Sequence, residues 1–203
     1  MIKNWIGTVR SKGKLRVAAE GLSGGAWGTI FDKALKNFNQ LMKDKGINLE
    51  LVATTKEAPA ADVTVRSAAK QASFNYSGGS YSKAFDGNGK HGLTVQLSDS
   101  ITKEITEAHI FVPATPRITS SDPKSRLLGA DGCLFILVHE LIHAAGLDND
   151  EHTLDDVFCY PGELVEGKTA ADDKLQPWGG LGKPMPPFVL SSKTIASLQQ
   201  AWP

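Results

Sequence analysis

Residues 139–143, which read His-Glu-Leu-Ile-His, constrain this chain more than any other stretch. They follow an uninterrupted apolar run over residues 133–138, which is too long for a surface loop and favours a buried helix. On a helix, residues four apart lie on one face, one turn above the other, so His139 and His143 project together. Two imidazoles placed in this way can share one tetrahedral metal ion, and Zn²⁺ is its usual occupant.

Glu140 lies beside the first of these histidines, where its carboxylate can take a proton from a water molecule at the metal. The competing interpretation is that both histidines are hydrogen-bonded core residues and that the pattern arose by chance. The buried helix and the glycine that follows it, Gly146, favour the metal site. The sequence therefore predicts a zinc hydrolase, with zinc as its cofactor.

Composition limits the alternatives. The 203 residues suffice for one core of ordinary size, and 41% hydrophobic with 22% charged residues is typical of a globular chain. Lysine plus arginine equals aspartate plus glutamate at 22 each, without a block of like charge, so we expect no nucleic acid or anionic membrane as a partner. No apolar run approaches the ~20 residues that a membrane span needs.

Two questions stay open at this stage. The first ten residues lack the apolar stretch of a secretory signal, so the location of the protein is not indicated. The two cysteines, Cys133 and Cys159, flank the histidine motif, and a bridge between them and two free thiols are both consistent with that spacing.

Hydrophobic periodicity predicts an α+β fold, in which a small mixed sheet packs on two helices and the second helix carries the motif. Strands are expected at 14–18, 47–53, 63–65, 93–97 and 108–112, a long loop at 75–92, and helices from Ile30 to Lys45-Gly46, from about Asp131 to Ala145, and after a cap at Ser191 or Ser192. We expect a single catalytic domain over 1–203. Its upper lobe would span about 1–147 and its irregular lower lobe about 148–203, with the metal between them.

Catalytic zinc needs a third protein ligand, which leaves one position open for water. Gly146, three residues after His143, allows a sharp turn that returns the chain to the metal. This arrangement resembles the metzincin clan of zinc peptidases, whose motif is H-E-x-x-H-x-x-G-x-x-H/D followed by a distant methionine turn. The expected order of elements is also similar to that of the clan, so the resemblance covers most of the chain.

The chain departs from the metzincin motif at its last position, where Asn149 stands in place of a histidine or aspartate. His152 is the nearest imidazole, and we favour it as third ligand because an all-histidine set leaves zinc a stronger Lewis acid. A solvent-exposed loop histidine is the competing interpretation of His152. The competing ligands are Asp148, Asp150, Asp155 and Asp156.

A second family deserves comparison. Thermolysin-like enzymes take a glutamate from a following helix as third ligand, and Glu163 lies 20 residues after His143. Pro161, Gly162 and Gly167 surround that glutamate and disfavour a long helix there. Gly146 would also have no role, so the thermolysin-like alternative ranks below the metzincin-like one.

The resemblance also implies a methionine beneath the metal ligands. Met185, in the proline-bounded segment 182–188, is the candidate for this Met-turn, with an ordinary core methionine as the alternative. Some metzincins place a tyrosine ligand two residues later. Here that position is Pro187, so such a tyrosine is absent or comes from elsewhere, with Tyr160 a weak candidate.

Three further segments receive simpler interpretations. Residues 86–89 (Asp-Gly-Asn-Gly) resemble the start of a calcium loop but read better as a solvated turn, and His109 reads as structural. The segment 107–113 could be the edge strand along which an extended peptide pairs, as in the metzincins.

The sequence as a whole predicts a zinc-dependent peptidase, which we expect to be an endopeptidase, acting on peptide or protein substrates. His139, His143 and His152 would bind zinc and Glu140 would be the general base. The alternative from another class is a zinc-stabilised binding module without turnover. Substrate specificity and oligomeric state are not indicated.

Overall fold

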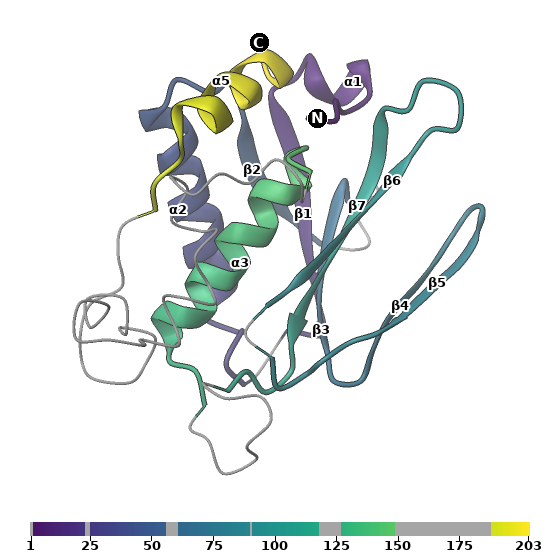
Figure 1. The fold of residues 1–203 in the computed structure, drawn as a ribbon, viewed down its shortest axis with the longest axis vertical. Coiled ribbons are helices and arrows are strands. Elements are labelled where there is room, and N and C mark those ends of the chain that lie inside the picture. Colours follow the sequence, from purple (N-terminus) through teal and green to yellow (C-terminus); the bar gives the residue numbers. More distant parts are fainter. Residues whose placement is uncertain (1, 23–24, 56–60, 90, 118–126, 149–187) are drawn as a thin grey trace.

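The computed structural model describes residues 2–22, 25–55, 61–89, 91–117, 127–148 and 188–203. Over these residues the chain forms a mixed five-stranded sheet, with helices α2 (Ile30–Asp44) and α3 (Ala130–Ala144) on one face and a β-hairpin on the other (Figure 1). The expected α+β architecture, a small mixed sheet packed against two helices, is confirmed at this level. The two ends of the chain lie at the same end of the molecule, beside the end of the sheet where β1 begins.

The sheet has the strand order β2-β1-β3-β7-β6. Neighbouring strands are parallel except for β6, which is antiparallel to β7. Their bounds are β1 Lys14–Glu20, β2 Glu50–Thr54, β3 Val63–Ala68, β6 Leu93–Ser98 and β7 Ile105–Pro113. All five strands expected from the periodicity are therefore present, and the antiparallel β6 forms one edge of the sheet.

The helices agree with their sequence signals. The apolar stripe of α2 is buried against the sheet and α3, and Gly46, in the left-handed region at φ 63°, follows it. The last helix, α5 (Ser192–Ala201), begins where expected, because the Ser191 hydroxyl accepts a hydrogen bond from the Thr194 backbone at 3.1 Å. A short helix, α1 (Gly7–Arg10), was not expected.

The prediction of a long loop over 75–92 is wrong for its first half. Strands β4 (Gln71–Tyr76) and β5 (Gly79–Ala84) form an antiparallel hairpin there. Its small polar residues resemble those of a loop, but Phe74 packs on the outer face of the sheet, with its ring centroid 3.5 Å from that of His109. Packing against the sheet, which composition does not reveal, stabilises these strands.

The interpretation of residues 107–113 as an edge strand is also wrong. They belong to β7, which pairs with β3 on one side and β6 on the other. Residues 108–113 are buried without alternation, as expected of an interior strand covered on both faces. The edge strand next to α3 is β6. Thr94 and Gln96 hydrogen-bond to α3, whereas the residues that alternate with them, Leu93, Val95 and Leu97, pack toward the hairpin.

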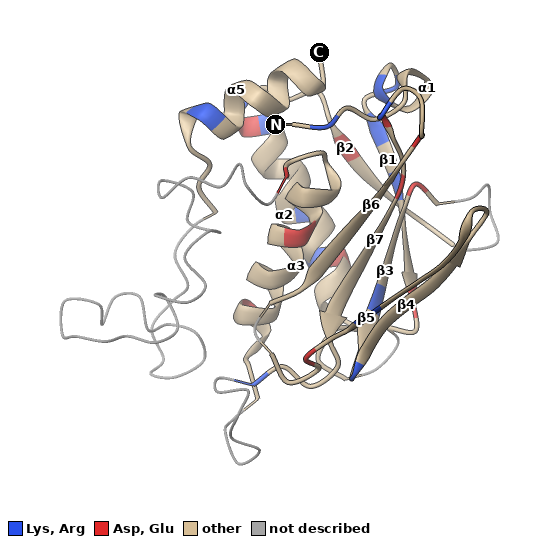
Figure 2. Cartoon of the chain, turned by 45° about the vertical axis from the view of Figure 1, so that its right-hand side comes forward, with Lys and Arg blue, Asp and Glu red and all other residues tan. Residues whose placement is uncertain are grey.

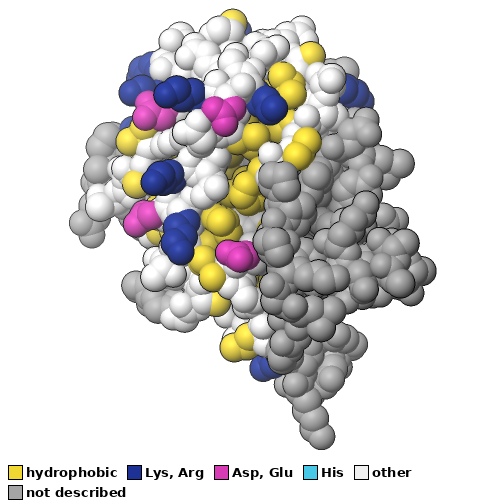
Figure 3. Space-filling view, turned by 90° about the vertical axis from the view of Figure 1, so that its left-hand side faces the viewer, with side chains coloured by type: hydrophobic (Ala, Val, Ile, Leu, Met, Phe, Trp, Pro, Cys, Tyr) yellow, Lys and Arg dark blue, Asp and Glu magenta, His cyan; other side chains and the backbone are white. Residues whose placement is uncertain are grey.

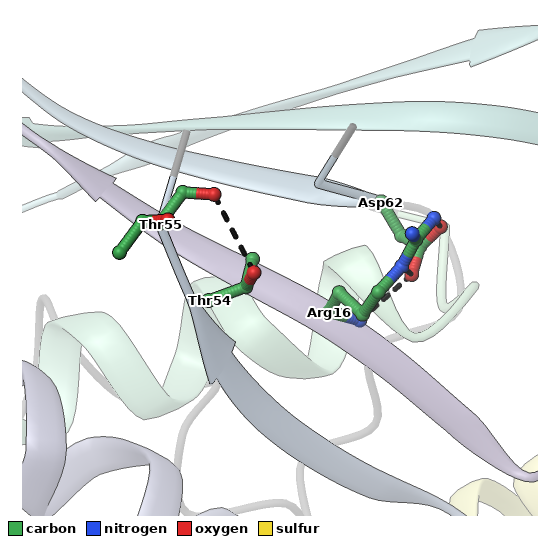
Figure 4. Close-up of polar contacts among 4 residues, drawn as sticks. All are labelled: Arg16, Thr54, Thr55 and Asp62. Carbon is green, nitrogen blue, oxygen red and sulfur yellow. Dashed lines mark hydrogen bonds and ion pairs between the residues drawn. The ribbon is translucent and has the colours of Figure 1, made fainter. Parts of the chain in front are cut away.

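One ion pair, between a buried aspartate and a partly exposed arginine, helps to join three strands of the sheet (Figure 4). Asp62, just before β3, accepts hydrogen bonds from the backbone and guanidinium of Arg16 on β1, at 2.7 to 3.0 Å. The Asp62 carbonyl also accepts from the backbone of Ala108 on β7. These bonds fix the register of β7 and, through it, the position of β6 beside the candidate site. At the carboxyl end of β2, the Thr54 hydroxyl donates to the Thr55 carbonyl at 3.4 Å.

The charges follow the even composition. Acidic and basic side chains are interspersed over the described part of the molecule (Figure 2). The face that carries α2 shows both signs side by side, together with a band of hydrophobic side chains (Figure 3). Among the described residues, no helix is long and apolar enough to span a membrane.

Candidate metal centre

The two histidines of the motif converge on one point beside α3. Their Nε2 atoms lie 3.0 Å apart and their ring centroids 4.7 Å apart. Two nitrogens on one tetrahedral zinc ion lie roughly 3.3 Å apart, because each Zn–N bond measures about 2.0–2.1 Å. The pair His139 and His143 therefore needs an adjustment of only a few tenths of an ångström to share a zinc ion.

The hydrogen bond at the other ring nitrogen of His143 sets the tautomer that a metal needs. Nδ1 lies 2.9 Å from the carbonyl oxygen of Leu147, and a carbonyl can only accept, so Nδ1 carries the proton. The lone pair of Nε2 then points toward His139. Ligand histidines are commonly oriented by such a partner, so this contact supports the metal interpretation.

A sharp turn after α3 places the Leu147 carbonyl under His143. Gly146 adopts φ 120°, and a Cβ there would lie 2.3 Å from the carbonyl oxygen of Lys3. The Lys3 backbone in turn donates to the Gly146 carbonyl at 2.9 Å. Only glycine fits this turn, which follows the end of α3 at Ala144.

Both ends of the chain support the carboxyl end of α3. The indole of Trp5 donates to the Ala144 carbonyl at 2.8 Å, and the indole of Trp202 donates to the Ala145 carbonyl at 2.9 Å. Both tryptophans are buried. The last carbonyls of a helix lack partners within the helix, so these two side chains complete its end and hold His143 in place. The sequence analysis did not identify either residue as a support for the site.

Glu140 lies on the same helix and is 4% exposed. Its Oε2 accepts a hydrogen bond of 2.6 Å from the Thr94 hydroxyl on β6, and Gly92, just before β6, packs against the Glu140 side chain. The other oxygen, Oε1, lies 4.0 Å from Nε2 of His139. Burial raises the pKa of Glu140 to about 7, against the opposing effect of the contacts with Thr94 and Gly92. A carboxylate with such a pKa, beside two candidate ligands, is suited to proton transfer near neutral pH.

The described residues supply two candidate metal ligands and no third. No group of three histidine, cysteine, aspartate or glutamate residues forms a metal site within the described ranges. Asp148, one of the competitors for the third position, lies instead 3.4 Å from the Lys3 ammonium. His152, which we expect to be the third ligand, lies outside the described residues. The other residues discussed for this position and for the Met-turn also lie outside them: Asn149, Asp150, Asp155, Asp156, Tyr160, Glu163, Met185 and Pro187.

The remaining candidate residues are placed as follows. His109 is buried in the interior strand β7, where the Arg66 guanidinium lies 2.8 Å from its Nδ1, as suits a structural residue. The backbone of Asn88 donates to Asp86 within a turn, as expected for that segment. Cys133 is buried, which raises the pKa of its thiol to about 12. Its proposed partner Cys159 is outside the described residues, so a bridge stays an open prediction.

Two residues of β6 and the glycine just before it contact α3, and sequence analysis missed all three. Besides Gly92 and Thr94, Gln96 donates from its side-chain amide to the His143 carbonyl at 2.7 Å. A signal was present in the sequence, since Thr94 and Gln96 alternate with the apolar Leu93, Val95 and Leu97. The alternation puts both polar side chains on the face toward the motif helix.

No protein-family model matches this chain, and no curated protein is similar enough to it to indicate common ancestry. The interpretation of the site therefore rests on its residues and their geometry.

Proposed function

We propose that this protein is a zinc-dependent peptidase of metzincin-like architecture. The single observation that carries the proposal is the arrangement on α3, where His139 and His143 present Nε2 atoms 3.0 Å apart and Glu140 lies beside them with one carboxylate oxygen 4.0 Å from His139. Two converging imidazoles and an adjacent carboxylate are the donor set of a hydrolytic zinc site. A pair of core histidines has no need of a buried carboxylate beside it.

The chain's own residues divide the chemistry between them. Zinc, when bound, lowers the pKa of water toward ~7 and polarises a peptide carbonyl group. Glu140 accepts the proton of the attacking water at Oε1 and later delivers it to the nitrogen of the leaving amine. The Leu147 carbonyl holds the tautomer of His143, and Trp5 and Trp202 hold the end of the helix that carries it.

The third ligand in this proposal is His152. Gly146 supports it, because the turn at φ 120° brings the backbone of Leu147 back to the His143 ring, 2.9 Å from Nδ1. The mixed sheet with its antiparallel edge strand β6 next to α3 agrees with the order of elements expected of a metzincin-like chain. Gly146, which has no role in the thermolysin-like ligand set, favours the metzincin-like one.

The test measures metal content and peptide-bond cleavage in the same preparation. We expect one zinc per chain after purification without added metal, and cleavage of an unfolded protein substrate that a chelator stops and zinc restores. A His139→Ala/His143→Ala variant, purified in parallel, is the control for a contaminating peptidase. A parent protein that retains no zinc after incubation with the metal would contradict the proposal.

A further inference from the structure

The edge strand β6 contacts the candidate general base directly, through Thr94. Thr94 Oγ lies 2.6 Å from Oε2 of Glu140 and 3.1 Å from the carbonyl oxygen of the same residue. Gly92, just before β6, lies against the Glu140 side chain. A single strand thus contacts both the side chain and the backbone of Glu140.

Gly92 is shaped to receive the carboxylate. A Cβ at this position would lie 2.5 Å from Cγ and 2.8 Å from Oε1 of Glu140, closer than real Cβ atoms approach other atoms. Any larger residue at position 92 would displace the glutamate. The backbone of Gly92 is not in the left-handed region. This position therefore requires glycine for its lack of a side chain and not for its backbone freedom.

The two oxygens of Glu140 are therefore unequal. Oε2 is engaged by the Thr94 hydroxyl, whereas Oε1 lies on the side of His139, 4.0 Å from its Nε2. The carboxylate is 4% exposed, so it has little water with which to exchange these partners. A side chain held at one oxygen in this way has its second oxygen fixed in direction as well.

We infer that Thr94 is a positioning residue, which makes Oε1 the proton-accepting oxygen of the general base. Because Gly92 has no side chain, the carboxylate of Glu140 can lie within reach of the Thr94 hydroxyl. This inference rests on the proposed function, because it assigns a role within the same site. Thr94 acts through Glu140 and touches no substrate.

The first test removes the Thr94 hydroxyl while keeping its shape. Thr94→Val should retain one zinc per chain and an unchanged KM, while kcat falls about 10- to 100-fold, the usual cost of losing such a supporting contact. Thr94→Ser, which keeps the hydroxyl, should recover kcat to within a few-fold of the parent. The matched control is Thr106→Val on the neighbouring strand, which removes a hydroxyl that donates to the Leu97 carbonyl and leaves Glu140 untouched.

The second test does not depend on turnover. Unfolding by urea is measured for the zinc-free parent, Thr94→Val, Glu140→Ala and the double variant. Thr94→Val should destabilise the parent and be near neutral when Glu140 is absent, because the hydroxyl then has no carboxylate to bind.

The outcomes separate the two proposals. A Thr94→Val variant with the kcat of the parent, or additive effects in the unfolding series, overturns the role of Thr94. A parent without peptidase activity overturns the proposed function, while the unfolding series still decides whether Thr94 holds Glu140.

Discussion

Two buried histidines, His143 on α3 and His109 on β7, differ in what their ring nitrogens meet. His143 is 3% exposed and His109 is 1% exposed, so burial does not distinguish them. His143 donates from Nδ1 to a carbonyl and turns the lone pair of Nε2 toward His139. His109 accepts a hydrogen bond at Nδ1 from Arg66, so its proton is on Nε2. Nε2 lies 3.0 Å from a carboxylate oxygen of Glu107, but the geometry is not that of a hydrogen bond.

The comparison shows that the partner of one ring nitrogen decides the use of the other. A carbonyl partner leaves His143 with a lone pair that a metal can take. The Arg66 guanidinium donates a hydrogen bond to the lone pair of His109, so His109 has no lone pair left for a metal ion. The same residue type is therefore a candidate ligand in one place and a structural residue in the other.

Replacing the two histidines should separate these roles with the largest effect. His143→Ala should abolish zinc binding and cleavage, because it removes a ligand and leaves His139 without its neighbour. His109→Gln should retain one zinc per chain, since glutamine can still accept from Arg66. Zinc content after dialysis, measured by atomic absorption, checks both. Loss of zinc in His109→Gln, with the fold intact by circular dichroism, would contradict the distinction.

A second pair of substitutions extends the comparison to residues beyond the described part of the chain. His152→Ala should lose zinc and cleavage, whereas Glu163→Ala should keep both nearly unchanged, because a carboxylate that is not a ligand contributes no metal bond. Competition with a chromophoric chelator measures the zinc affinity of each variant. The reverse pattern would favour the thermolysin-like ligand set. No effect at either position would direct attention to Asp148, Asp150, Asp155 or Asp156.

Gly146 connects the partner of His143 to the fold, and replacing it should have the next largest effect. Gly146→Ala should lower the free energy of unfolding by about 3 kcal/mol, because φ 120° is strained for alanine and its Cβ would meet the Lys3 carbonyl. Gly7→Ala at the start of α1, where a Cβ meets nothing within 4 Å, is the matched control and should change stability by less than about 0.5 kcal/mol. Urea unfolding monitored by tryptophan fluorescence tests both. Equal stabilities for the two variants would contradict the assigned role of the turn.

The environment of His109 should make stability depend on pH. Burial, together with the charge of Arg66, lowers the pKa of His109 to about 4 from its usual 6.5. Between these values the unfolded chain takes up a proton that the folded chain does not, so stability falls as the pH falls from about 6.5 to 4. The part due to His109 should be about 2 kcal/mol between pH 7 and pH 5, and His109→Gln should remove it. An identical pH dependence in parent and variant would show that His109 is not held neutral.

The sequence was sufficient for features with a local signal. Spacing and apolar context predicted α3 and the pairing of His139 with His143, and a serine cap predicted α5. The hairpin of β4 and β5 was missed because it depends on Phe74 packing across the sheet. The interior position of β7 was missed because strand order depends on contacts between distant segments.

The supports of the site were harder to predict than its reactive residues. Thr94 precedes Glu140 by 46 positions, and Trp5 precedes Ala144 by 139. No spacing rule links residues so far apart, although the alternation of Thr94 and Gln96 in β6 did indicate which face they share. A motif therefore predicts candidate reactive residues, whereas the fold decides what orients them.

The central claim is that Glu140 acts as a base beside zinc held by His139 and His143, and Glu140→Gln tests it most directly. This variant keeps the shape of the side chain and removes its ability to accept a proton. Zinc content and the rate of cleavage of an unfolded protein are measured on the same sample. The account predicts one zinc per chain, as in the parent, with cleavage reduced to the background of the His139→Ala/His143→Ala control. A zinc-bound Glu140→Gln variant that cleaves at the rate of the parent would contradict it.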